Sequence, residues 1–147
     1  CDMGKCAIAT AIGGNLFRWL YQDWTLGVLV AGLACIVGHV FPAFYGFKGG
    51  KGVLCGLASL LMVDWRIGLL VVVVFAIVVA ICKRVSLGSI CACASAPVWC
   101  LLLGVPTLHT VYVLLAASWL IWCHRSNIKR LLAGAEPKTV IAKRKPR

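Results

Sequence analysis

The residues best suited to chemistry lie between Gly38 and Val53. Two lysines and four glycines fall within the seven residues 46–52. Glycines let backbone N–H groups turn toward a ligand, and a helix that begins at Val53 would direct the positive end of its dipole to the same place. We therefore predict a phosphate-binding loop made of Lys48, Gly49, Gly50, Lys51 and Gly52.

This loop is not a nucleotide-binding Walker A motif. That motif has four residues between its first glycine and a Gly-Lys pair, and a Ser or Thr follows the pair. Here three residues separate Gly46 from Gly50, and Lys51 is followed by Gly52. A flexible basic loop at a membrane surface explains the composition about equally well. His39 favours a site, because an ionisable side chain within an apolar helix is costly in lipid, although a hydrogen-bonded structural histidine is the commoner role.

Two further clusters carry polar side chains next to apolar segments. Ser86 and Ser89 follow Lys83-Arg84, and Ser86 is placed either to cap a helix or to donate a hydrogen bond to a phosphate. His124 and Asn127 are three residues apart, so they share one face if the last helix continues past them. No acidic residue lies close enough in sequence to these motifs to be proposed as a general base.

The composition places these clusters in a membrane protein. Of the 147 residues, 62% are hydrophobic and 13% are charged, against roughly 25% charged in soluble domains. A net charge of +11 is compatible with nucleic-acid binding, but basic residues between long apolar runs are more typical of a membrane protein. We expect membrane lipids, and no nucleic acid, as surroundings.

The apolar segments predict an all-α integral membrane protein, a polytopic bundle of six short transmembrane helices. They cover about Cys6–Leu20, Leu26–Phe44, Val53–Val63, Ile67–Cys82, Leu87–Leu103 and Leu108–Cys123. Crossing the hydrocarbon core takes about 20 residues, so the third segment is too short alone. We interpret Val53–Cys82 as two short helices that meet at Asp64–Arg66.

Positive charge assigns the ends of these helices to sides of the membrane. With six crossings, 13 of the 15 Lys and Arg residues fall on one face, and only Arg18 and Arg66 fall on the other. Cytoplasmic loops retain Lys and Arg, so the three polar clusters and the basic tail from His124 to Arg147 should be cytoplasmic. If Val53–Cys82 were one long crossing, Lys83 and Arg84 would move to the opposite face, and the difference in positive charge between the two faces would be smaller.

The nine cysteines do not predict a metal site. Most lie in or beside apolar segments, where we interpret them as small packing residues. Cys91-x-Cys93 has the wrong spacing for a zinc pair, and no second Cys/His pair accompanies it. We expect no metal and no cofactor.

Three blocks together resemble the acyl-phosphate:glycerol-3-phosphate acyltransferase family. They are Gly38-His39-x-Phe41-Pro42 with Phe47–Gly52, Ser86–Ile90, and His124-Arg125-x-Asn127-Ile128. The family's C-terminus resembles Leu131–Lys138, and its Asp-x-x-Lys helix opening resembles Asp2 and Lys5. The family's first signature and first membrane helix have no counterpart, and Cys6 stands where the family usually has Gly. The resemblance therefore implies a remainder of a seven-helix protein, with a membrane domain at 1–123 and a cytoplasmic tail at 124–147.

The resemblance implies an activity in the bacterial inner membrane. An acyl group would move from acyl phosphate to the 1-hydroxyl of glycerol 3-phosphate, giving lysophosphatidic acid and phosphate for phospholipid synthesis. The loop Lys48–Gly52 would bind a substrate phosphate. The catalytic residues would be His39, Ser86, Ser89, His124 and Asn127, which orient the acyl phosphate and stabilise charge on its carbonyl oxygen. Either His39 or His124, or a substrate phosphate oxygen, could accept the hydroxyl proton.

Other classes of protein fit parts of the pattern. A small transporter or channel subunit would also have short helices and a charged inner mouth, and an anionic-lipid-binding subunit would need the same basic face. A haem protein is a poorer fit, because His39 and His124 are expected near one face and His109 near the other. The acyl-transfer His-x4-Asp signature is absent after both His39 and His124.

Overall fold

The computed structural model describes residues 2–43, 46 and 49–138, and within these it contains seven helices and no strand. The helices are α1 (Asp2–Tyr21), α2 (Trp24–Val40), α3 (Val53–Val63), α4 (Trp65–Cys82), α5 (Val85–Leu102), α6 (Thr107–Cys123) and α7 (Arg125–Leu132). The predicted all-α fold and the division at Asp64 are confirmed. The short α7 lies in the segment that the sequence assigns to the tail.

Local capping explains most helix boundaries. Asp23 accepts a hydrogen bond from the backbone N–H of Leu26 and so caps α2, and Asp64 accepts one from Arg66 and so caps α4. The prediction that the second helix reaches Phe44 was too long, because α2 ends at Val40. Pro42 explains this end, since proline disfavours helical geometry at the residue before it.

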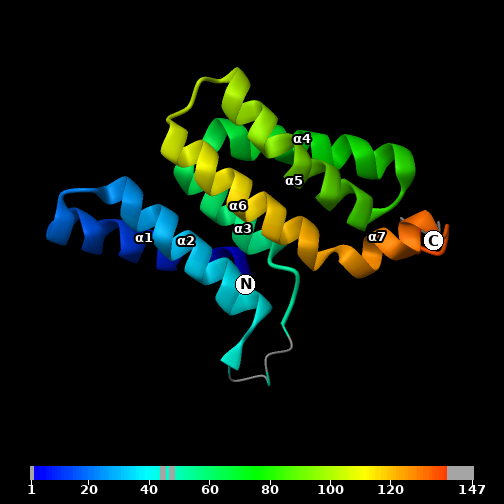
Figure 1. The fold of residues 1–147 in the computed structure, drawn as a ribbon, viewed down its shortest axis with the longest axis horizontal. Coiled ribbons are helices and arrows are strands. Elements are labelled where there is room, and N and C mark those ends of the chain that lie inside the picture. The colour runs from blue at the N-terminus through cyan, green and yellow to red at the C-terminus, as the bar shows by residue number, and fades with distance from the viewer. Residues whose placement is uncertain (1, 44–45, 47–48, 139–147) are drawn as a thin grey trace, which may run out of the picture.

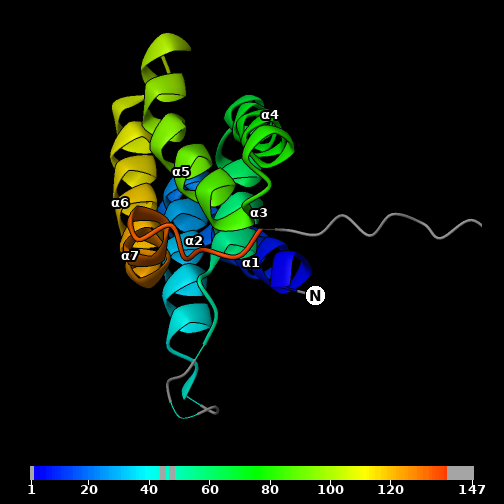
Figure 2. The same ribbon diagram turned by 90° about the vertical axis from the view of Figure 1, so that its right-hand side faces the viewer.

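The helices form two groups that meet through α3 and α6. α1 packs along α2 and also touches α3, whereas α4 packs on α5 and α5 on α6. Figure 1 shows α1 and α2 side by side at one side of the molecule and α4 with α5 at the other. Figure 2 gives the same arrangement from the side, with α7 near the start of α5. The site described below lies where these two groups meet.

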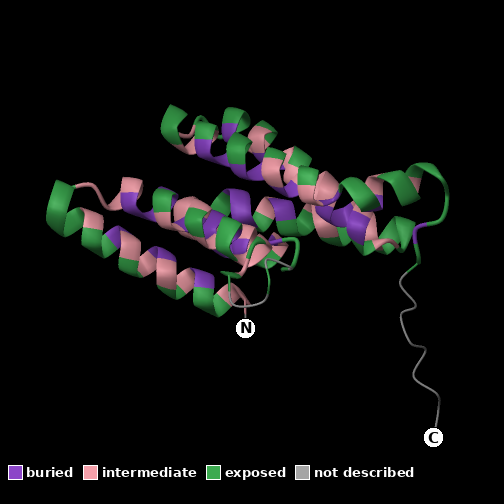
Figure 3. Ribbon diagram, turned by 60° about the horizontal axis from the view of Figure 1, so that its bottom comes forward, coloured by how far each residue is buried: buried purple, intermediate pink, exposed green. Residues whose placement is uncertain are grey.

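Burial follows the inner faces of the helices (Figure 3). One core cluster joins α2, α3, α4, α5 and α6 around Leu29, Ile67 and Val113. A second cluster joins α1, α2, α3 and α6 around Cys6, Ile36 and Leu120. Large apolar side chains such as Ile81 and Leu101, 75% and 74% exposed, cover much of the outer surface, which suits contact with lipid.

Two helices in the described residues are long and apolar enough to cross a membrane, α4 and α5. The α6–α7 pair, bent by 59°, counts as a third if it is one broken span, and α2 and α3 are shorter apolar helices. Only 17% of the residues of α4, the most apolar of these helices, are buried inside the protein. Lipid is the solvent that such a surface requires.

Candidate functional site

A polar pocket of about 520 Å³ opens where α3 and α5 begin and where α6 passes into α7. Its polar lining comes from Lys51, Ser86, Ser89, His124, Asn127, Glu136 and Lys138. Five of these were predicted as site residues. The structure therefore brings three clusters that are distant in sequence to one place.

Glu136 is the central polar side chain of this pocket. It is 7% exposed, and its Oε1 accepts hydrogen bonds from Ser86 Oγ at 2.5 Å and from Asn127 Nδ2 at 2.7 Å. Its Oε2 accepts from Arg130 Nε at 2.7 Å. Donation by Ser86 and then by Asn127 lowers the pKa of the Glu136 carboxyl to about 2. Glu136 is therefore ionised, and it fixes the orientation of two predicted catalytic side chains.

His124 lies between α6 and α7 and is 1% exposed. Its Nδ1 lies 2.8 Å from the backbone oxygen of Leu120, so Nδ1 carries the proton and Nε2 keeps its lone pair. Burial lowers the pKa of His124, and the nearby charge of Lys51 lowers it further. The neutral imidazole is thus the form present near pH 7.

Asn127 has one unused hydrogen-bonding atom. Its Nδ2 donates to Glu136, whereas its Oδ1 is buried without a partner among the described residues. A buried acceptor without a partner is costly. In a pocket lined by Asn127, a ligand hydroxyl group is a suitable donor to that oxygen.

Two helix N-termini without capping side chains point to the pocket. α3 begins after Gly52 and α5 after Arg84, and neither residue provides a side-chain cap. Val53 and Val85, the first residues of the two helices, both line the pocket. Free first-turn N–H groups and the positive dipole ends favour an anion, as does Lys51 beside them. Burial lowers the pKa of Lys51, while the charge of Glu136 opposes that shift.

The predicted phosphate loop is divided between two neighbourhoods. Lys51 lines the pocket and the buried Gly52 starts α3, but Gly49 and Gly50 pack against His39. A side chain at Gly49 would collide with the His39 carbonyl oxygen, and one at Gly50 would collide with the imidazole. The predicted contribution of Lys48 lies outside the described residues.

His39 is not among the residues that line the pocket. Its Nδ1 lies 3.2 Å from Lys5 Nζ and 3.7 Å from an Asp2 oxygen, and Lys5 and Asp2 form an ion pair of 2.9 Å. The structure thus groups His39 with the start of α1. The catalytic role of His39 remains a prediction. His39 and His124 belong to two different groups of side chains, because His124 lines the pocket and His39 does not.

Ser89 differs from Ser86 in its contacts. Its hydroxyl donates to the backbone oxygen of Val85 in the same helix, as serines in helices often do. Ser89 lines both the polar pocket and an adjoining apolar groove of about 260 Å³. The groove continues between α3, α4, α5 and α6 past Ala92 and Ala96. A polar head with an apolar tail would fit the two spaces together.

Gly52 offers a direct test of the loop geometry. Its φ of +76° lies in the left-handed region, which costs other residues about 1–2 kcal/mol. We expect Gly52→Ala to destabilise the protein by that amount in reversible unfolding in mixed micelles. Gly4→Ala, which adds a Cβ into open space in α1, is the control and should not destabilise. Equal stability of the two variants would contradict the loop conformation.

Sequence reasoning missed Glu136 as a site residue. Glu136 lies 50 positions from Ser86 in the sequence, and only the fold brings its carboxylate to that hydroxyl group. The available signal was its rarity, because the chain has four acidic residues in all. One carboxylate next to an apolar membrane domain is costly unless it is paired.

Comparison with known proteins gives one consistent result. A family model described as glycerol-3-phosphate acyltransferase matches residues 1–134. The glycerol-3-phosphate acyltransferase of Ruegeria sp. (strain TM1040) is 46% identical over 110 residues, which are 74% of this chain and 54% of that protein. The one from Synechococcus sp. (strain CC9902) is 37% identical over 137 residues, 93% of this chain and 66% of that protein. This chain thus spans between half and two thirds of these relatives.

Solved structures agree with the sequence comparison. The crystal structure of PlsY (YgiH), an integral membrane glycerol 3-phosphate acyltransferase, in its glycerol 3-phosphate form has a TM-score of 0.78 and 29% identity. The match covers 92% of this chain and 68% of that one. Its lysophosphatidic acid form gives a TM-score of 0.77 and 30% identity over 92% and 69%. Fold and sequence therefore point to the same group of proteins.

Proposed function

The chain belongs to the glycerol-3-phosphate acyltransferase family, and from this membership we propose that it takes part in acyl transfer from acyl phosphate to the 1-hydroxyl of glycerol 3-phosphate. The products are lysophosphatidic acid and inorganic phosphate. The observation that carries the proposal is the convergence of two uncapped helix N-termini and Lys51 on a pocket that continues into an apolar groove. Both substrates are phosphates, and one has a long apolar tail.

Charge neutralisation is the main contribution of the pocket. Lys51 and the first-turn N–H groups of α3 and α5 bind phosphate oxygens of the substrates. Ser86, held by Glu136, and the Asn127 amide orient the groups that react. Of the predicted loop, Lys51 lines the pocket and Gly52 precedes α3. The protein thereby supplies fixed dipoles where negative charge develops on the acyl carbonyl oxygen.

The hydroxyl proton has two candidate acceptors near the pocket. The first is neutral His124, whose Nδ1 is occupied by the Leu120 carbonyl and whose Nε2 has a free lone pair. The second is an oxygen of a substrate phosphate. The unpartnered Oδ1 of Asn127 is suited to accept a hydrogen bond from a glycerol hydroxyl and so hold it in place.

The orientation follows from charge. Lys5, Lys51, Lys83 and Arg84 stand at ends of helices that the alternation of crossings assigns to the pocket's side. Because positive residues stay in the cytoplasm, we place the pocket and the C-terminal segment there, in the inner membrane of a bacterium. Soluble glycerol 3-phosphate then reaches the pocket from the cytoplasm.

The test is transfer from synthetic palmitoyl phosphate to radiolabelled glycerol 3-phosphate in detergent micelles. It uses this chain and a chimera that adds the part of the Ruegeria relative outside the match, each with a Lys51→Ala control. We expect labelled lysophosphatidic acid from at least the chimera. Loss of the lysine should reduce kcat/KM about 10–100-fold, because a charge-assisted phosphate contact contributes about 1.5–3 kcal/mol. Folded proteins that give no product in either form would exclude the proposal.

The apolar groove makes a prediction about acyl length. Ala96 is buried in the groove, seven residues beyond Ser89 on α5 and thus about 10 Å from it. Ala96→Phe should block the far end and shift the ratio of kcat/KM between dodecanoyl and palmitoyl phosphate toward the shorter donor by roughly 10-fold or more.

The control for this shift is Leu101→Phe, on the exposed outer surface of the same helix. It should keep the ratio of the unsubstituted protein. A ratio that is unchanged in Ala96→Phe, with palmitoyl transfer intact, would show that the acyl chain lies elsewhere.

A further inference from the structure

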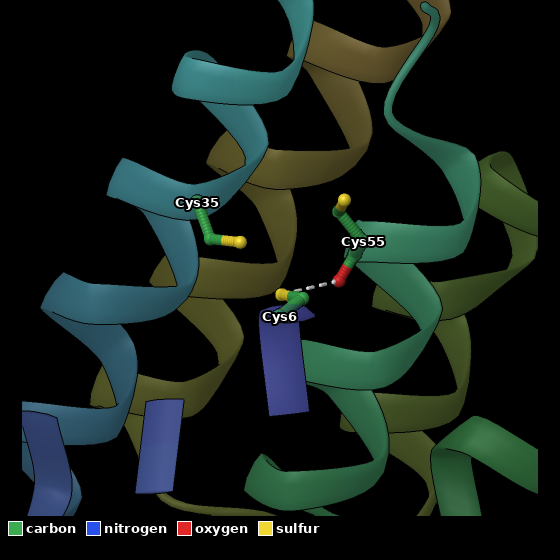
Figure 4. A group of neighbouring side chains, drawn as sticks. All are labelled: Cys6, Cys35 and Cys55. Atoms are coloured by element: carbon green, nitrogen blue, oxygen red, sulfur yellow. Dashed lines mark hydrogen bonds between the residues drawn. The ribbon is translucent and has the colours of Figure 1, made fainter. Parts of the chain in front are cut away.

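Three cysteines from three helices meet at one point in the core. Cys6 of α1, Cys35 of α2 and Cys55 of α3 have sulfur atoms that all lie within 4.8 Å of one another. Figure 4 shows the three side chains around one space between the helices. Cys6 and Cys55 are fully buried, and Cys35 is half-buried. None of the three is in a disulfide.

We propose that Cys6, Cys35 and Cys55 form a thiolate site for a soft monovalent metal ion of the copper(I) class. Thiolate ligands select copper(I), zinc and iron–sulfur clusters. Structural zinc takes four protein ligands, whereas among the described residues this cluster offers three and no His, Asp or Glu joins it. Three soft ligands, the number found among the described residues, favour the trigonal coordination that copper(I) accepts.

The geometry is close to what such a site needs. Three sulfurs around one ion, each at a metal–sulfur distance of about 2.3 Å, lie about 4 Å apart. The present separations, all within 4.8 Å, are near this value. Cys6 Sγ now donates to the Cys55 carbonyl oxygen at 3.2 Å, and Cys55 Sγ to the Asp2 carbonyl oxygen at 3.7 Å. These weak hydrogen bonds would be exchanged for bonds to the metal.

Burial of Cys6 and Cys55 disfavours charged thiolates, so the metal ion itself must displace the thiol protons, and two features of the surroundings assist it. Cys55 is in the first turn of α3, where the helix dipole stabilises a negative sulfur. Lys5 directly precedes Cys6 and lies at the exposed start of α1. Binding releases the thiol protons. The bound ion would tie α1, α2 and α3 together just behind the loop that carries Lys51.

The proposal is independent of acyl transfer and is tested by metal binding. Copper(I) is titrated anaerobically into the reduced protein in detergent against a chromophoric copper(I) chelator. We expect one ion per chain and three sulfur neighbours in X-ray absorption spectra of the unsubstituted protein. Cys35→Ala should weaken binding by about 100-fold or more, because even indirect partners of a metal ligand contribute 10–100-fold.

The matched control is Cys91→Ala, a half-buried cysteine of α5 outside the cluster, which should bind as the unsubstituted protein does. Thermal unfolding without metal shows whether Cys35→Ala is folded, and the absorption spectrum requires no variant. Fewer than three sulfur neighbours, equal binding by both variants, preference for zinc, or a disulfide among the three cysteines in the reduced preparation would each overturn the proposal.

Discussion

Glu136→Ala should lower kcat for acyl transfer by on the order of 100-fold or more, the effect expected when a preorganised polar group loses its position. Glu136 itself need not touch substrate. Without its carboxylate, Ser86 Oγ and Asn127 Nδ2 lose their common acceptor, and Arg130 loses its ion pair. Two donors that faced the pocket in one orientation would then rotate freely.

Glu136→Gln separates positioning from charge. The amide oxygen can still accept hydrogen bonds from Ser86 and Asn127, but the ion pair with Arg130 is lost. We therefore expect it to retain more activity than Glu136→Ala. The control is Asp64→Asn, which breaks a comparable ion pair with Arg66 at the start of α4. Full activity in Glu136→Ala would show that the pocket's hydrogen bonds do not matter for transfer.

The same carboxyl group makes the protein sensitive to acid. Its pKa is about 2 in the folded protein against 4.5 ordinarily. As pH falls from 4.5 toward 2, the unfolded chain takes up a proton that the folded protein does not, so the folded state loses stability over that range. Glu136→Gln should show a smaller loss over that range, to which the ion-paired Asp2 and Asp64 still contribute; the loss is read from unfolding in micelles at successive pH values.

Sequence patterns were sufficient to locate the helices because polar residues interrupt the apolar runs sharply. α3 has its predicted bounds, Val53–Val63, since Gly52 and Asp64 end the apolar segment on both sides. α2 ended earlier than predicted because hydrophobicity continues through Pro42 although the backbone geometry does not.

The site could be predicted only as separate motifs. Lys51, Ser86, His124 and Asn127 stood out through residue type and spacing, and the fold brings them together. Glu136 follows α7 and returns to Ser86 through a turn that no periodic pattern describes. Likewise, 29 and 20 residues separate the three clustered cysteines along the chain, and only packing places them together. Contacts between distant segments need the tertiary structure.

His124→Asn should lower kcat by about 10²–10⁴-fold if Nε2 accepts the hydroxyl proton, the usual contribution of a general base. Asparagine is the informative replacement. Its amide N–H can still donate to the Leu120 carbonyl oxygen as Nδ1–H does now, but it has no basic nitrogen. His124→Ala would also leave that carbonyl oxygen without its partner. It would leave a cavity as well, because the His124 side chain is only 1% exposed. The effect of this variant would therefore mix folding with chemistry.

The pH dependence of the single-turnover rate separates the two proton acceptors. Burial holds the pKa of His124 below 6.5, so the histidine stays neutral and competent until pH falls below that value. A substrate phosphate has its own pKa near 6 and also gives an acid limb. If His124 is the base, His124→Asn loses both rate and acid limb. If the phosphate is the base, the variant keeps the limb, and the role of His124 is reduced to positioning the groups around it.

Stability gives an independent check on the protonation state of His124. Because its pKa is lower in the folded protein than in the unfolded chain, the unfolded chain binds more protons as pH falls below 6.5, and the folded state is destabilised there. The loss from His124 begins near pH 6.5 and that from Glu136 near pH 4.5, so on acidification the His124 loss should start first and the Glu136 loss second. His124→Asn should abolish the first and keep the second. A first loss that persists in this variant would mean that another group titrates, and the neutral imidazole in the pocket would lose its support.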